Sequence, residues 1–236
     1  MYSYELHLHT RETSHCGHVP AAEQVRTYHD LGYTGICITD HLHDGYYDPL
    51  LSAPEWHKAM EAHLLGYRNA MEEGRKLGMD IILSAELRFP GSERDYLIYG
   101  IDESWLFNHP HMCHMSVQEF YERYRNEVLI IQAHPYRGYD TVYWESIHGL
   151  EICNTSPRHD SRNHLALALL KEHPYFHPIA GSDAHRHGDE GGAALLCEHR
   201  IHDSYEMKKV ITSGHYSLWC PAYQEIIKES EAIKHV

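Results

Sequence analysis

The sequence alternates short β-rich runs with longer helical stretches along most of its length. Seven runs are predicted to be strands, over residues 2–9, 34–39, 80–85, 96–101, 128–133, 149–153 and 178–182, with two weaker candidates at 193–197 and 215–219. Five helices are predicted between them, over residues 20–31, 54–77, 116–127, 161–172 and 204–213. Repeated strand–helix alternation favours a mostly parallel sheet, either closed as a barrel or open and doubly wound.

The composition indicates one folded domain over residues 1–236. Hydrophobic residues make up 42% of the chain and charged residues 23%, and no Pro/Gly/Ser-rich linker divides it. Because no apolar stretch is long enough to cross a membrane and no export signal is recognisable, we expect a cytoplasmic protein with no membrane partner and six reduced cysteines. The formal charge of −14 weighs against binding long nucleic acids, which usually requires clustered Lys and Arg.

Histidine is unusually frequent, since 24 His residues outnumber the 20 Lys and Arg residues together. Imidazole is the commonest metal-binding side chain, but position has to decide which rings bind. Candidate ligands stand at or just after the ends of the predicted strands: His7, His9, His41, Glu86, Asp102, His134, Asp183 and His185. In parallel β/α barrels, these strand ends meet at the face that carries the active site. The sequence therefore predicts a metal site at that face.

Each candidate also has an ordinary structural explanation when it is taken alone. The His7-x-His9 pair can arise by chance, although its spacing puts both rings on one side of a strand. Glu86 could be a solvated strand-end carboxylate, and His134 a core histidine with satisfied hydrogen bonds. Asp183 could cap a loop. The shared location of all these residues at strand ends favours the metal site.

The motifs together resemble those of a known family. His7-Leu8-His9-Thr10, the following His15, Ile38-Thr39-Asp40-His41, Glu86, Ala133-His134-Pro135 and Gly181-Ser182-Asp183-Ala184-His185 look like the motif series of the PHP (polymerase and histidinol phosphatase) family. The resemblance implies an α/β fold, a distorted seven-stranded (β/α)7 TIM-like barrel that holds up to three metal ions and hydrolyses phosphoesters. It also implies three sets of ligands: His7, His9, Glu86 and Asp183 for one ion, Glu86 and His134 for a second, and His15, His41 and His185 for a third.

The sequence departs from the family pattern after the fourth predicted strand. Many family members have another histidine there, whereas this chain reads Tyr99-Gly100-Ile101-Asp102. Asp102 could replace that ligand, or the second ion could be held less tightly. The nearby His109, His111 and His114 are weaker alternatives, because a loop tract of histidines is usually solvated.

The mixed histidine and carboxylate set suits two to three divalent ions of Zn, Mn or Fe. Such ions would depress the pKa of a bridging water, supply hydroxide near neutral pH and hold the phosphoryl oxygens. We expect Asp40 to orient neighbouring ligands. Arg137 and Arg158 lie just beyond strand ends, where a guanidinium could grip a phosphate, and His159 is a candidate proton donor to the leaving group. Four tyrosines in the same loops could stack on a base or sugar: Tyr46, Tyr47, Tyr136 and Tyr139.

The favoured function is metal-dependent hydrolysis of a phosphate ester, with a small phosphorylated metabolite or nucleotide as substrate. Three alternatives remain open at this point: a nuclease that trims short oligonucleotides, an amidohydrolase on a similar barrel, and a non-catalytic metal-binding domain. The two arginines favour a phosphate over a neutral amide. The native metal and the oligomeric state are not indicated by the sequence.

Overall fold

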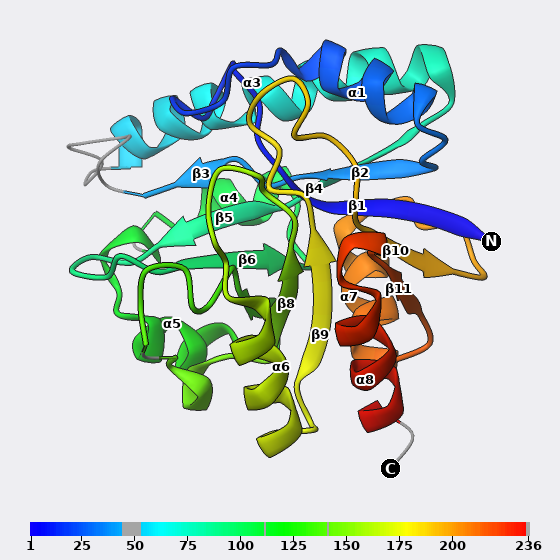
Figure 1. The fold of residues 1–236 in the computed structure, drawn as a ribbon. Helices are drawn as coiled ribbons and strands as arrows, with labels where there is room; N and C mark the ends of the chain where they lie inside the picture. Colours follow the sequence, from blue (N-terminus) through cyan, green and yellow to red (C-terminus); the bar gives the residue numbers. More distant parts are fainter. Residues whose placement is uncertain (44–52, 111, 141, 235–236) are drawn as a thin grey trace.

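The computed structural model describes residues 1–43, 53–110, 112–140 and 142–234, and its strands form two mixed sheets (Figure 1). The strands are β1 (Tyr2–Leu8), β2 (Gly35–Ile38), β3 (His41–Leu42), β4 (Asp80–Leu83), β5 (Ala85–Arg88), β6 (Asp95–Tyr99), β7 (Leu129–Gln132), β8 (Gly149–Asn154), β9 (His177–Gly181), β10 (Ala194–Cys197) and β11 (Ser217–Trp219). The order is β11-β10-β1-β2-β4 in one sheet and β3-β5-β6-β7-β8-β9 in the other. The seven predicted strands and both weaker candidates are confirmed to within a few residues.

The strand directions correct one expectation. The pairs β1–β2, β2–β4, β7–β8 and β8–β9 are parallel, as expected for strand–helix alternation. However, β6 runs antiparallel to both of its neighbours, and β10 runs antiparallel to β1 and β11. The sheets are therefore mixed, and β6 presents its first residue, Asp95, to the face where the parallel strands end.

Two junctions hold the sheets together at that face. At the first, β4 ends at Leu83 and β5 begins at Ala85, so this stretch passes from one sheet directly into the other. At the second, the ends of β1 and β9 meet: the Asp183 N–H donates to the His7 carbonyl at 2.8 Å, and the His9 N–H donates to the Ala184 carbonyl at 3.0 Å. The junctions bring the motif-bearing ends of β1, β3, β5 and β9 to one place.

The helices lie outside the strands (Figure 1). They are α1 (Ala21–Asp30), α3 (Ala53–Leu77), α4 (Glu103–Asn108), α5 (Val117–Tyr124), α6 (Asn163–Glu172), α7 (Ser204–Ser213) and α8 (Gln224–Lys234), with 3-10 turns η1 (Met112–His114), η2 (Trp144–Ser146) and η3 (Pro221–Tyr223). All five predicted helices are confirmed, and α4 and α8 are additional. Ser116 and Glu119 form the capping box that starts α5.

The hydrophobic core lies between the strands and these helices. Strand β7 is fully buried along its length, as a continuous apolar run predicts for a strand covered on both faces. Helices α1 and α3 pack side by side along one side of the molecule, while α6 and α8 pack together on another (Figure 1). Among the described helices, none combines the length and apolar character needed to cross a membrane.

Candidate metal centre

The Glu86 carboxylate lies at the centre of a buried cluster of imidazoles. Its Oε1 is 3.4 Å from His7 Nε2 and 3.3 Å from His134 Nε2, and its Oε2 is 3.2 Å from His9 Nε2 and 2.9 Å from His41 Nδ1. The Glu86 side chain is completely buried, yet neither oxygen accepts a hydrogen bond from the described residues. A buried carboxylate in this state is costly unless a cation offsets its charge.

Among the described residues, four overlapping groups of possible ligand atoms surround this carboxylate. Within each group the atoms lie less than 4.8 Å from one another: His7, His9 and Asp183; His7, Glu86 and His134; His41, Glu86 and Asp95; and His9, His41 and His185. Two ligands bound to one tetrahedral zinc at about 2.0–2.1 Å are separated by about 3.3 Å, close to the spacings around Glu86. The donor set therefore fits one or more divalent ions.

His7 is held in the orientation that metal binding requires. Its Nδ1 lies 2.9 Å from Glu151 Oε1, which leaves Nε2 directed toward Glu86 and His9. The Asp183 Oδ1 lies 3.5 Å from the same Nε2. The other Glu151 oxygen accepts the backbone N–H of His134 at 2.8 Å. That contact stabilises the backbone of His134, whose φ of 27° is one that L-residues rarely adopt. Glu151 thus positions two candidate ligands.

Asp40 reaches the cluster through Ser14 and not directly. The Ser14 hydroxyl donates to Asp40 Oδ1 at 2.7 Å and lies 3.2 Å from His9 Nδ1. Thr10 adds two more bonds to Asp40, from its N–H and its hydroxyl, each 2.7 Å long. Asp40 therefore fixes the turn that carries Ser14, and Ser14 orients the His9 ring so that Nε2 faces Glu86.

The structure does not bring Asp102 to the cluster. Its carboxylate caps α4 by accepting the Trp105 N–H at 2.7 Å, at the end of β6 that points away from Glu86. Asp95, at the opposite end of the same strand, lies beside Glu86 and His41 and is paired with Arg88 at 2.7 Å. Because β6 is antiparallel, Asp95 replaces Asp102 among the candidate ligands.

Asp183 and His185 complete the cluster from the segment after β9. Asp183 Oδ1 lies 3.4 Å from His9 Nε2, and its Oδ2 accepts a 2.7 Å bond from Arg137 Nη1. Like His134, Asp183 has a positive φ, of 54°. His185 Nδ1 lies 2.9 Å from the Asp183 carbonyl and 2.9 Å from Arg158 Nη2, so its Nε2 is turned toward the cavity.

The loop after β1 places Cys16, and not His15, beside the group formed by His9, His41 and His185. The Cys16 Sγ lies 3.1 Å from His185 Nε2, whereas the His15 side chain is exposed. Neither residue belongs to the four groups. Burial alone would raise the pKa of the Cys16 thiol, but hydrogen bonds with His185 and His41 lower it to about 4. The sequence motifs implied that His15 joins His41 and His185, but in the structure its side chain is exposed.

The comparisons with known proteins assign the family. A family model of the PHP domain matches residues 5–230, which is nearly the whole chain. The chain belongs to the PHP domain family. No curated protein sequence matches it. This membership agrees with the motif series from His7 to His185 and with the buried histidine and carboxylate cluster that those motifs build.

Solved structures share the fold of this chain at low sequence identity. A two-domain protein from Bacteroides vulgatus, containing a predicted PHP-like metal-dependent phosphoesterase, has a TM-score of 0.67 and 12% identity over 98% of this chain and 69% of that one. An amidohydrolase from Chromobacterium violaceum, with bound sulfate and no metal, has a TM-score of 0.54 and 13% identity over 94% and 99%. A putative metal-dependent phosphoesterase from Bifidobacterium adolescentis has a TM-score of 0.51 and 13% identity over 88% and 95%. These identities support a shared fold and no more.

Charge pairing dominates the electrostatics of the PHP site. Burial opposes ionisation of Glu86 and Asp183, but the neighbouring imidazoles, led by His41 for Glu86 and by His7 for Asp183, hold the pKa of each carboxylate well below its usual value. Conversely, burial would lower the pKa of His7, while Glu151, Glu86 and Asp183 raise it well above 6.5. Without metal, His7 thus retains a proton that a divalent ion would displace.

A cavity of about 380 Å³ opens onto the cluster. Its walls include Arg137, Arg158 and His159 together with Glu86, Asp183 and His185. Tyr139 also lines it, whereas Tyr46, Tyr47 and His111 lie outside the described residues. His109 stacks on Trp105, and His114 is exposed; neither belongs to the four groups.

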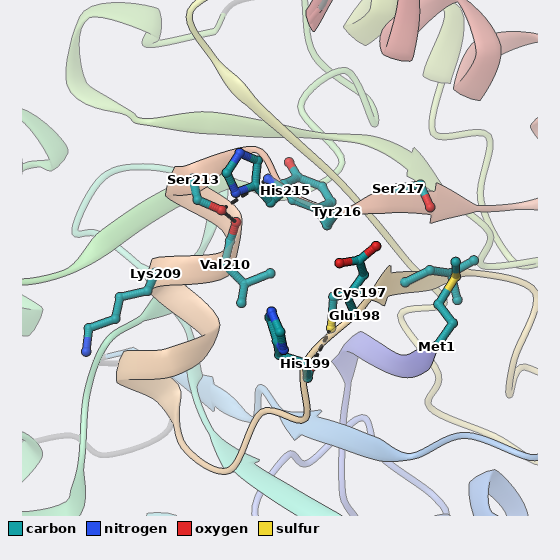
Figure 2. Close-up of a pocket in the computed structure, with 11 residues that line it drawn as sticks. Met1, Cys197, Glu198, His199, Lys209, Val210, Ser213, His215, Tyr216 and Ser217 are labelled. Carbon is teal, nitrogen blue, oxygen red and sulfur yellow. Dashed lines mark hydrogen bonds between the residues drawn. The ribbon is translucent and has the colours of Figure 1, made fainter.

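A second cavity, of about 620 Å³, lies between β10, α7 and β11 (Figure 2). Its lining includes Met1, Glu198, His199, Lys209 and His215. Met1 precedes β1, whose other end carries His7, so this cavity is about 20 Å from the metal centre along that strand. None of the candidate ligands lines it.

Four residues of the site were not predicted from the sequence: Asp95, Glu151, Ser14 and Cys16. For Glu151 a signal was present, because it is a carboxylate inside the apolar strand Gly149–Asn154. A buried charge in such a strand needs a partner, and His7 is that partner. Predicting Asp95 would have required knowing the direction of β6.

Proposed function

We propose that this chain is a metal-dependent phosphoesterase that hydrolyses a phosphate ester of a small molecule. The observation that carries the proposal is the buried Glu86 carboxylate, which has imidazole nitrogens beside both oxygens and accepts no hydrogen bond from the described residues. Two arginines, Arg137 and Arg158, line the same cavity and supply positive charge next to the cluster. Divalent ions and guanidinium groups together suit a phosphate group.

The residues present suit two to three ions. His7, His9 and Asp183 would hold one, Glu86 and His134 would hold a second, and His41 with His185 would hold a third. Zn, Mn and Fe all accept such a donor set. When bound, ions of this kind provide Lewis acidity and lower the pKa of water, which is the chemistry that phosphoester hydrolysis needs.

The protein side chains would orient and neutralise the substrate. Arg137 holds Asp183 in place through Nη1 and donates to Asn154 through Nη2 at 2.6 Å. Its guanidinium is therefore fixed, and it would attract an anionic substrate through its charge. Arg158 is anchored by Asp189 at 3.1 Å. The pKa of His159 is lowered by its partial burial and by the charges of Arg137 and Arg158. An anionic substrate would offset those charges and so favour the protonated imidazole that can donate to a leaving group.

The size of the cavity supports a small substrate. A volume of about 380 Å³ lies at the lower end of the range for small-molecule sites. The chain also carries 34 Asp and Glu against 20 Lys and Arg. A sugar phosphate or a mononucleotide therefore suits this site better than a long polynucleotide does.

We also propose that the strands form a distorted seven-stranded barrel. The β4–β5 passage and the β1–β9 contact each connect one sheet to the other. When β4 and β5 are counted as one continuous strand, the closed order has seven strands: β1, β2, β4 with β5, β6, β7, β8 and β9. The antiparallel β6 is the distortion.

Amide hydrolysis is the second candidate, because one structural neighbour is described as an amidohydrolase. The experiment that separates the two measures metal content of protein purified without chelator. The same protein is then assayed with an aryl phosphate, a nucleotide panel and an N-acyl amino acid panel, before and after EDTA. We expect two to three equivalents of metal and EDTA-sensitive phosphate release.

Two variants make that assay specific. Glu86→Gln should abolish phosphate release and reduce metal content, while Glu198→Gln, in the distant cavity of Figure 2, should change neither. Metal with amide turnover alone would support the second candidate. Metal without any turnover would contradict both.

A further inference from the structure

We propose that Cys16 is a thiolate ligand of the ion held by His41 and His185. The proposal rests on the proposed function only in requiring metal at this face. It differs from the ligand set implied by the sequence motifs, in which His15 fills this position.

The backbone around Cys16 is fixed against the segment that carries His185. The Gly17 N–H donates to the Ser14 carbonyl at 2.8 Å, and the His18 N–H donates to the His185 carbonyl at 2.7 Å. A Cβ at Gly17 would lie 2.6 Å from the Thr10 carbonyl oxygen, so only glycine fits this turn. These contacts hold the loop with Cys16 facing the cavity and the His15 side chain exposed.

The geometry around Cys16 matches a thiolate–imidazole pair on one ion. A tetrahedral ion with bonds of about 2.3 Å to sulfur and about 2.0 Å to nitrogen separates these atoms by about 3.5 Å. The Cys16 Sγ lies 3.1 Å from His185 Nε2, and His185 Nδ1 is held by the Asp183 carbonyl. Small adjustments of two side chains would bring the pair to coordination distance.

The remaining ligands already converge on this point. The rings of His9 and His41 have centroids 4.3 Å apart, and those of His9 and His185 are 4.1 Å apart. One ligand atom from each of these three residues lies within 4.8 Å of the others. Because His9 Nε2 faces His7 at 3.2 Å and one imidazole nitrogen binds one ion, His9 belongs to the neighbouring ion. Cys16 then supplies the third ligand beside His41 and His185.

The buried charge beside this position is an independent indication of a cation. Glu86 Oε2 is 2.9 Å from His41 Nδ1 and accepts no hydrogen bond from the described part of the chain. A thiolate with two imidazoles leaves one position open for substrate or water. Since thiolate is a soft ligand, the site should prefer Zn2+ or Co2+ to Mn2+ or Mg2+.

Cobalt substitution tests the assignment without relying on activity. Metal-free protein is reconstituted with Co2+ under a phosphine reductant, bound cobalt is counted, and the sulfur-to-cobalt charge-transfer absorption in the near ultraviolet is recorded. Wild type, His15→Ala and the matched control Cys197→Ser should all show the band. Cys16→Ser should lose the band, and its affinity for one ion should fall at least about tenfold.

Several outcomes would overturn the proposal: cobalt binding to wild type without the band, a band that persists in Cys16→Ser, or a band lost in His15→Ala. If Cys16→Ser fails to fold, X-ray absorption of the wild-type zinc protein decides, since a sulfur neighbour at about 2.3 Å is required. Phosphate release by the same samples is scored separately. A band without phosphate release supports the Cys16 thiolate ligand and refutes the phosphoesterase function. Phosphate release without a band refutes the thiolate ligand and supports the phosphoesterase function.

Discussion

Replacing Glu151 by glutamine should weaken metal binding although Glu151 is not itself placed as a ligand. Its two oxygens receive three contacts: His7 Nδ1 at 2.9 Å, the His134 N–H at 2.8 Å and Asn154 Nδ2 at 3.0 Å. Glutamine has one carbonyl oxygen and one NH2 group in the same space. If its oxygen keeps the bond to His134, its NH2 faces His7 Nδ1 and donates to it. The His7 proton then moves to Nε2, the atom that has to bind the metal.

The size of the effect follows from the role of the contact. Substitution of a group that orients a metal-bound histidine typically costs about 10–100-fold in metal affinity. That range corresponds to about 1.4–2.7 kcal/mol for the ion that His7 helps to hold. We expect the loss to concern this ion, because the contacts of Cys16 and His185 do not involve Glu151.

Competition with a fluorescent zinc chelator would measure this loss. Glu145→Gln is the matched control, because Glu145 is an exposed glutamate shortly before Glu151 in the sequence. Thermal unfolding of the metal-free proteins shows whether the fold survives. If Glu151→Gln binds metal as tightly as wild type while the fold is intact, the argument that Glu151 fixes the His7 tautomer is refuted.

Three further predictions concern single groups. Asp95→Asn should reduce metal affinity about tenfold, while Asp102→Asn, which preserves a helix cap, should leave it unchanged in the same chelator assay. Arg137→Lys should also lower the metal affinity about tenfold, because lysine cannot bond Asp183 and a second acceptor at once. A raised KM with unchanged metal affinity would contradict this role of Arg137. Burial lowers the pKa of His148 from 6.5 to about 4. Between these two pH values the unfolded chain binds a proton at His148 that the folded protein does not, so stability is unaffected above pH 6.5 and decreases as the pH falls toward 4. His148→Asn, which retains an acceptor, should remove about 1–2 kcal/mol of that pH dependence in urea unfolding, after allowance for the partly exposed ring.

The fold could be predicted closely where local signals are strong. The capping box of Ser116 and Glu119 and the long amphipathic stretch of α3 identify helices directly. The apolar run of β7 identifies a buried strand. The short helix α4 escaped prediction, because a six-residue element has little periodicity and Asp102 was assigned to the site instead of to the cap.

The candidate site could be predicted where side-chain position follows from the end of a parallel strand. His7, Glu86 and Asp183 lie together because β1, β5 and β9 all deliver their ends to one face. Cys16 could not be chosen over His15 in the same way. Neighbouring residues in a turn point in different directions, and only the bonds of the turn to the His185 segment decide which one faces the cavity.

The error at Asp102 has a different cause, because the direction of a strand is not encoded in its own residues. The run from Asp95 to Tyr99 reads equally well either way along the sheet. The connection before it does carry the information: only residues 89–94 separate β5 from β6, whereas a parallel crossover needs a dozen residues or more. A connection this short requires β6 to turn back beside β5, so the chain enters β6 from the metal face. The candidate ligand is then the first residue of the strand, Asp95, and Asp102, which follows the last residue of the strand, has to lie at the opposite end.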